Sequence, residues 1–125
     1  MDECSQERKL LAEEFLSNRK IFIALGDEIR QQIFIELLEN EPVGMRVPEI
    51  TKCTHLSRPA VSHHLKILKE AGIVNMVRIG TMNYYYVNAD QKCWNGFKKL
   101  ADHVVQEAEF AKNSGYPFIE EGSEE

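Results

Sequence analysis

The chain has 125 residues, of which 43% are hydrophobic, and this length suits a single domain with a modest core. Its formal net charge is −5, which at first argues against a nucleic-acid partner. It contains no run of 18 apolar residues, so no membrane-spanning segment and no membrane partner are expected. The first residues, MDECSQERKL, lack the apolar core of an export signal.

The charge is distributed unevenly along the chain. Residues 42–88 hold six Lys or Arg and two Glu, a local charge of +4, whereas the remainder carries −9. Phosphate contacts depend on local rather than total charge, so a basic segment between acidic ends is compatible with DNA binding.

Apolar periodicity and cap signals predict a mainly α-helical domain over residues 1–112, in the order helix, helix, helix, helix, hairpin, helix. Residues 113–125 are expected to form a loose acidic tail, in which Tyr116 and Phe118 could dock. The helices are expected at about residues 5–18, 26–40, 47–54, 57–71 and 90–112, and the strands at 73–78 and 83–87.

The fourth helix, in LSRPAVSHHLKILKEAGIV, has the clearest signals. Ser57 is a good N-cap residue, and Gly72 ends the helix as a C-cap glycine does. Val61, Leu65 and Leu68 recur at helical spacing and should face inward. The opposite side then carries no acidic residue and presents Arg58, Ser62, His63, Lys66 and Lys69. His64 should be partly buried.

A short helix followed by a turn and a polar-faced helix predicts a helix-turn-helix, whose second helix enters the DNA major groove. Arg can bond both acceptors of guanine, whereas Lys acts as a point charge on phosphate. The hairpin adds Arg78 and Thr81 near its tip as further DNA-contacting residues. The alternative interpretation of the helix alone is a solvated amphipathic surface with some basic residues.

Three segments, ALGDEIRQQIFIELL, LSRPAVSHHLKILKEAGIV and VRIGTMNYYYV, closely resemble the ArsR/SmtB family of winged helix-turn-helix repressors. The resemblance covers roughly residues 20–112. It implies a cytoplasmic homodimer that binds operator DNA and leaves it when an inducer binds. It also implies that the DNA-reading residues are Ser57, Arg58, Ser62, His63 and Lys66. In the wing, Arg78 matches the family, whereas Thr81 stands where many relatives have a basic residue.

The metal sites of this family are not reproduced in the sequence. The positions that correspond to a CxC pair are Arg46 and Pro48, which cannot bind a soft metal. A second kind of site, between the last helices of a dimer, would retain only the weak candidates Asp90 and His103. The two remaining positions are Lys92 and Gln106, and tetrahedral zinc needs four good ligands. No metal and no cofactor are therefore expected.

The three cysteines, Cys4, Cys53 and Cys93, form no CxxC pair, which favours a reduced cytoplasmic setting. Cys53 and Cys93 are weak candidates for a redox switch, because a helix N-terminus near Cys93 would favour its thiolate. Cys53 could equally be a small buried hydrophobic residue. The inducer is therefore left open among a metal, a redox species, an organic ligand or none.

The first and last helices carry apolar residues that could form a homodimer interface, with Trp94, Phe97, Leu100 and Val104 against Leu11 and Phe15 of the partner. A twofold dimer would set two recognition helices about 34 Å apart, which predicts a near-palindromic operator in double-stranded DNA. A rival hypothesis is a winged-helix module that binds only proteins. No catalytic motif is present to suggest an enzyme.

Overall fold

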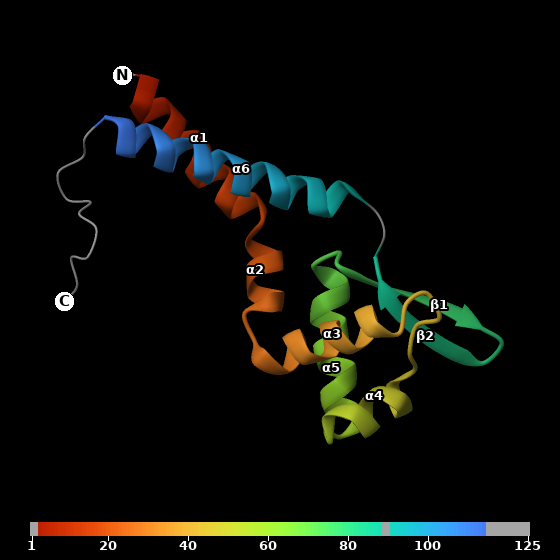
Figure 1. The fold of residues 1–125 in the computed structure, drawn as a ribbon. Coiled ribbons are helices and arrows are strands. Elements are labelled where there is room, and N and C mark those ends of the chain that lie inside the picture. The colour runs from red at the N-terminus through yellow and green to blue at the C-terminus, as the bar shows by residue number, and fades with distance from the viewer. Residues whose placement is uncertain (1–2, 89–90, 115–125) are drawn as a thin grey trace, which may run out of the picture.

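The computed structural model describes residues 3–88 and 91–114, apart from the side chain of Cys4. These residues form six helices and one two-stranded antiparallel sheet (Figure 1). The elements are α1 (Glu3–Ser17), α2 (Arg19–Leu25), α3 (Glu28–Glu39), α4 (Val47–Thr54), α5 (Arg58–Glu70), β1 (Val74–Ile79), β2 (Met82–Val87) and α6 (Gln91–Asn113). The expected fold is confirmed, with one helix that the sequence analysis did not predict.

That additional helix is α2, and its separation from α1 depends on Asn18. Asn18 is 7% exposed, and its side-chain amide donates to the carbonyl of Glu14 at 2.8 Å and to that of Gly96 at 3.5 Å. The chain turns at this residue, so α2 leaves the direction of α1 (Figure 1). The first expected helix therefore ends as predicted, but the chain folds into a further short helix before α3.

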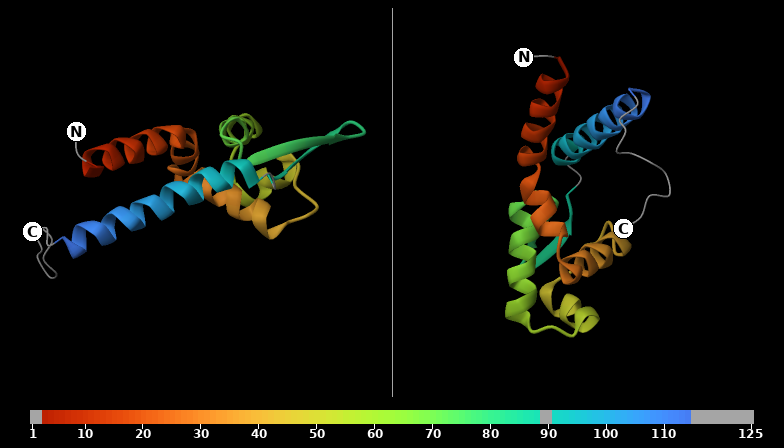
Figure 2. Two further views of the ribbon diagram at one scale, coloured as in Figure 1. Left: turned by 90° about the horizontal axis from the view of Figure 1, so that it is seen from above. Right: turned by 90° about the vertical axis from the view of Figure 1, so that its left-hand side faces the viewer.

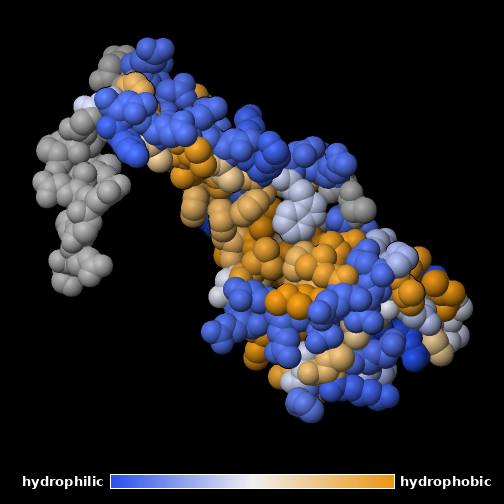
Figure 3. Space-filling model, viewed as in Figure 1, coloured by the Kyte–Doolittle hydropathy of each residue, from blue (hydrophilic) through white to orange (hydrophobic). Residues whose placement is uncertain are grey.

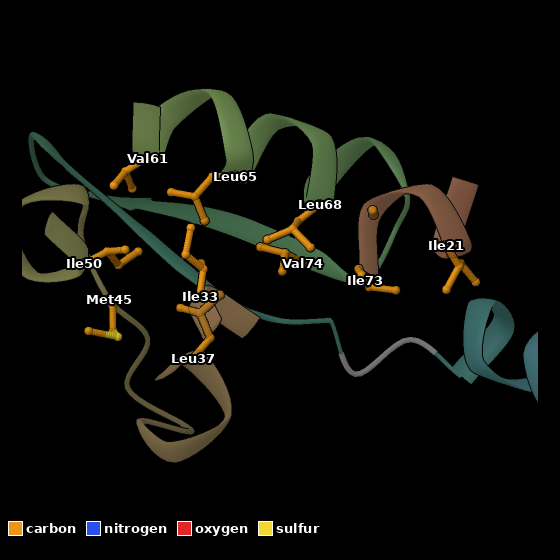
Figure 4. Close-up of a cluster of buried hydrophobic side chains, with 11 residues drawn as sticks. Ile21, Ile33, Leu37, Met45, Ile50, Val61, Leu65, Leu68, Ile73 and Val74 are labelled. Atoms are coloured by element: carbon orange, nitrogen blue, oxygen red, sulfur yellow. The ribbon is translucent and has the colours of Figure 1, made fainter. Parts of the chain in front are cut away.

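The core lies between α3, α4, α5 and the base of the hairpin. Val61, Leu65 and Leu68 are fully buried, as predicted, and point from α5 toward Ile33 and Ile50 (Figure 4). Ser57 caps α5 by accepting the backbone N–H of Ala60 at 3.3 Å. These contacts fix which side of α5 faces outward, because the apolar stripe can be buried in only one orientation.

The hairpin is paired in register from Val74 opposite Val87 to Ile79 opposite Met82. The strands therefore extend one residue further toward the tip than predicted, and only Gly80 and Thr81 form the turn. Gly80 has a φ of +65°, a value that suits glycine in such a tight turn. An isolated bridge between Met45 and Tyr85 anchors the base of the hairpin to the chain before α4.

Helix α6 lies alongside α1, and the two helices extend away from the core (Figures 1 and 2). Trp94, near the start of α6, packs on Phe34 with ring centroids 6.0 Å apart, and Phe97 packs on Phe22 at 5.7 Å. These two aromatic residues, expected at a dimer interface, therefore make contacts within their own chain. Among the described residues, no helix is long and apolar enough to cross a membrane.

Candidate nucleic-acid interface

The outward face of α5 is the candidate interface. Arg58, Ser62, His63 and Lys66 are all exposed, and Ser57 is exposed at the N-cap. The structure thus places these sequence-predicted residues on one helix that projects from the core. The helix has no acid in its first turn, and its only acid is Glu70 at the last position. An exposed helix of this composition can enter a major groove without repelling the phosphates.

A short turn connects α4 to α5 and gives the two helices their relative orientation. His55 ends α4 in the left-handed conformation, with a φ of +59°, and its N–H donates to the carbonyl of Thr51 at 2.9 Å. This reversal brings α4 beside α5, which is the helix-turn-helix arrangement predicted from the sequence.

Arg30 positions the recognition helix, and sequence reasoning missed this role. Its side chain is 12% exposed and donates to the carbonyls of Ala24 at 2.7 Å and Ile23 at 3.0 Å, at the end of α2. A further guanidinium nitrogen lies 3.3 Å from Nδ1 of His64 on α5. Burial lowers the pKa of His64, which favours the neutral imidazole that can accept this hydrogen bond.

The hairpin is the second part of the candidate interface. Arg78 and Thr81 are exposed, at the distal end of the hairpin and in its turn. Arg46, at the start of α4, is also connected to the wing, because its guanidinium lies 3.1 Å from the sulfur of Met82. The sequence offered no signal for this contact between residues 36 positions apart.

The side chains of two cysteines are described, and both are half-buried: Cys53 on α4 and Cys93 on α6. Burial raises the pKa of the Cys53 thiol, and the nearby carboxylates of Glu36 and Glu49 act in the same direction. A raised pKa lowers the thiolate fraction of Cys53, and the thiolate is the reactive form of cysteine. Cys93 Sγ lies 3.8 Å from the carbonyl of Ala71, against the end of α5.

Of the two weak metal candidates in the sequence analysis, the structure describes only His103. Asp90 lies outside the described residues. His103 faces α1. The hydrogen bond from its ring to Glu14 raises the pKa of His103, and a second hydrogen bond to Glu7 raises it further, whereas burial lowers it. These acids lie 89 and 96 positions away in the sequence, which is why the sequence analysis did not associate them with His103.

The buried stripe of α5, the short turn before it and the paired wing after it define a winged helix-turn-helix protein of the DNA-binding class. The sequence pattern described as "Bacterial regulatory protein, arsR family" matches residues 27–76. An uncharacterized HTH-type transcriptional regulator of Methanocaldococcus jannaschii is 40% identical over 79 residues, covering 63% of this chain and 86% of that protein. The chain belongs to the ArsR family of transcriptional regulators, a class of DNA-binding proteins rather than enzymes.

Other similar proteins agree with this assignment. A transcriptional repressor SmtB homolog of Synechocystis is 33% identical over 87 residues, covering 70% of this chain and 63% of that protein. An ArsR-like transcriptional regulator from Rhodococcus has the same fold, with a TM-score of 0.71 at 21% identity over 82% of this chain and 90% of that one. A homodimeric winged helix-turn-helix DNA-binding domain from Mycobacterium bovis superposes with a TM-score of 0.55 at 22% identity, covering 96% and 100% of the two chains.

Proposed function

We propose that this regulator is a dimeric repressor that reads its operator with α5 and the wing. The observation that carries the proposal is the exposed, basic face of α5, held outward by the fully buried Val61, Leu65 and Leu68. Arg58 would bond a base edge, and Lys66 a phosphate. Ser57, Ser62 and His63 would lie in or beside the groove, with Arg78 and Thr81 on the adjacent backbone. This role would place the protein in the cytoplasm, where it reaches DNA.

An apolar groove between α1 and α6 supports the dimer. It is lined by Leu11, Phe15, Leu16, Leu100 and Val104. Phe15 and Leu16 are 51% and 54% exposed, which is unusual for side chains of this size in a groove. Hydrophobic side chains also gather in a band on the face below α6 (Figure 3). A second copy of the chain would cover this groove, and the similar Mycobacterium bovis domain is described as homodimeric.

A twofold dimer implies a particular form of operator. The two copies of α5 would enter successive major grooves about 34–36 Å apart, one helical turn of DNA. The operator would then be near-palindromic, with half-sites separated by one turn. Binding there would block transcription, in agreement with the name repressor that the Synechocystis relative carries.

The test is duplex binding to the promoter DNA of the protein's own gene, measured by fluorescence anisotropy. Arg58→Ala removes two contacts from a dimer bound to its operator, each worth about 1–3 kcal/mol if it is a bidentate Arg–guanine pair, so it should weaken binding at least about 30-fold. Arg19→Ala is a matched control, because Arg19 is an exposed arginine on α2. Equal losses for both variants would contradict the assignment of the reading face. A wild-type protein that binds no duplex but retains a protein partner would support the protein-binding hypothesis.

We also propose that an inducer releases the operator. Its chemical class is tested by repeating the titration with zinc, cadmium, arsenite, an oxidant and a persulfide. Release by one of them assigns the class of inducer. Binding unaffected by all five would favour an organic inducer or constitutive binding.

A further inference from the structure

His103 lies at the seam between α1 and α6, with a carboxylate on each side of its ring. Its Nε2 is 3.0 Å from Oε2 of Glu7, and its Nδ1 is 3.1 Å from both carboxylate oxygens of Glu14. Glu107, one turn further along α6, places Oε1 3.9 Å from Nε2. His103 and three glutamates from two helices of one chain therefore form a compact cluster.

The two ring nitrogens of His103 are not equivalent in this cluster. If a metal ion displaces the proton that Nε2 shares with Glu7, the lone pair of Nε2 is directed toward Glu7 and Glu107, while Nδ1–H still donates to Glu14. Histidines that bind metal commonly have this arrangement, in which a carboxylate accepts from one nitrogen and the other nitrogen binds the ion. Glu14 thus orients the ring, and Glu7 and Glu107 stand on the side of the available lone pair.

The distances fit a metal ion of the size of zinc. Zinc–nitrogen and zinc–oxygen bonds of about 2.1 Å in a tetrahedral site place two ligand atoms about 3.4 Å apart. The distances of 3.0 Å from Nε2 to Glu7 and 3.9 Å from Nε2 to Glu107 lie on either side of this value. The ligand atoms of Glu7, His103 and Glu107 all lie within 4.8 Å of one another. Binding one ion through all three ligands requires rotations of the two glutamate side chains.

The charge of the cluster also favours a cation. Among the described residues, the salt bridges of Glu7, Glu14 and Glu107 are all with His103. The nearby Lys98 is paired with Asp102 at 2.8 Å. The side chains of His103, Glu14 and Glu107 are 13%, 23% and 24% exposed, whereas that of Glu7 is 46% exposed, so solvent screens the charge of Glu7 more than those of the other three.

An ion can reach the cluster from the surface. One open hollow is lined by Glu7, Glu107 and Gln106, on the Nε2 side of His103. Glu7, Glu14 and His103 line a second hollow, together with Lys98 and Lys99 of α6. The site is therefore partly enclosed by the two helices and still accessible.

We propose that Glu7, Nε2 of His103 and Glu107 bind a divalent transition-metal ion of the zinc type within a single chain, and that Glu14 orients His103. One nitrogen and two carboxylate ligands suit zinc and similar borderline ions, and a water molecule would take the fourth position. This ligand set differs from the one in the sequence analysis, which combined His103 with Asp90 between the last helices of two chains. The bound ion would fasten α1 to α6.

The test is a metal titration of the full-length protein under reducing conditions. Co²⁺ binding is followed by its visible absorption, and Zn²⁺ affinity is measured by competition with a chromophoric chelator. The wild-type chain should bind one ion, without a thiolate-to-cobalt charge-transfer band. The key variant is Glu107→Gln, which removes a ligand but leaves the contacts of His103 with Glu7 and Glu14, so the helix pair should stay folded.

Glu107→Gln should lower the Zn²⁺ affinity at least tenfold, and Glu14→Gln about 10- to 100-fold, the usual effect of losing the partner of a metal-binding histidine. Glu109→Gln is the matched control, because Glu109 is an exposed glutamate on the same helix, and it should bind as the wild type does. Equal affinities for all three variants would overturn the proposal. So would a thiolate charge-transfer band, or a folded wild-type protein that binds neither metal.

Discussion

Lys66 offers the most quantitative test of how the protein docks on DNA. It is exposed on α5, and among the described residues no salt bridge involves it. It lies one turn beyond Ser62 on a helix whose opposite side is fully buried, so replacing Lys66 should not disturb the core. If each Lys66 neutralises one phosphate, Lys66→Ala removes two phosphate contacts from a dimer bound to its operator.

The expected effect follows from counterion release. Each phosphate contact contributes about −0.9 to the slope of log K against log salt, so the double loss should flatten the slope by about 1.8. Between about 50 and 200 mM salt this amounts to roughly a tenfold change in the ratio of wild-type to variant affinity. The variant should therefore be most impaired at low salt and approach the wild type as salt increases.

The assay is fluorescence anisotropy with operator DNA at four or more salt concentrations. Lys112→Ala is the control, because it removes the same charge from an exposed site in the last turn of α6, far from α5 (Figure 1). Its slope should equal that of the wild type. Parallel slopes for Lys66→Ala and the wild type would refute the phosphate contact, whatever the loss of affinity.

Three further predictions concern folding stability. Leu65→Ala should lower the free energy of unfolding by about 2–5 kcal/mol in a urea titration, because Leu65 is fully buried, and an unchanged midpoint would contradict its place in the core. Gly72→Ala should lower the free energy of unfolding by about 1–2 kcal/mol, because Gly72 has a φ of +84°. Gly80→Asn should leave it nearly unchanged, because Asn tolerates a φ of +65° and a Cβ there would meet no atom within 4 Å. Equal losses of stability for the two variants would argue against backbone strain as the cause. Asp27 is the N-cap residue of α3, and the hydrogen bond that its carboxylate accepts from the backbone N–H of Arg30 holds its pKa below the usual value. The stability from this cap is therefore present above about pH 4 and is lost as the pH falls through the lowered pKa. Thermal melts from about pH 6 to pH 2 should therefore fall less steeply for Asp27→Ala than for the wild type, and identical profiles would exclude this contribution.

The recognition helix could be predicted from the sequence because its determinants are local. Ser57 caps it, Gly72 follows its end, and the apolar stripe from Val61 to Leu68 decides which side is buried. The outward position of His63 and the partial burial of His64 follow from the same periodicity, since neighbouring residues on a helix point about 100° apart. The same periodicity predicts the outward-facing Arg58, Ser62 and Lys66 without any knowledge of the tertiary structure.

The break between α1 and α2 could not be predicted in this way. The segment RKIFIAL is short and mostly apolar, and Asn18 makes no side-chain cap for α2. Its amide instead reaches back to Glu14 and across to Gly96 on α6, a contact between residues 78 positions apart. Trp94 gives a similar lesson, because an apolar stripe indicates burial but does not distinguish the chain's own Phe34 from a second subunit.

The contacts of Arg30 have a mechanical consequence. One planar side chain is hydrogen-bonded to the carbonyls of Ile23 and Ala24 near the end of α2 and to His64, the neighbour of the outward-facing His63. Because α2 follows α1, this guanidinium ties the segment formed by α1 and α2 to α5 by hydrogen bonds, which restrict changes in the angle between them.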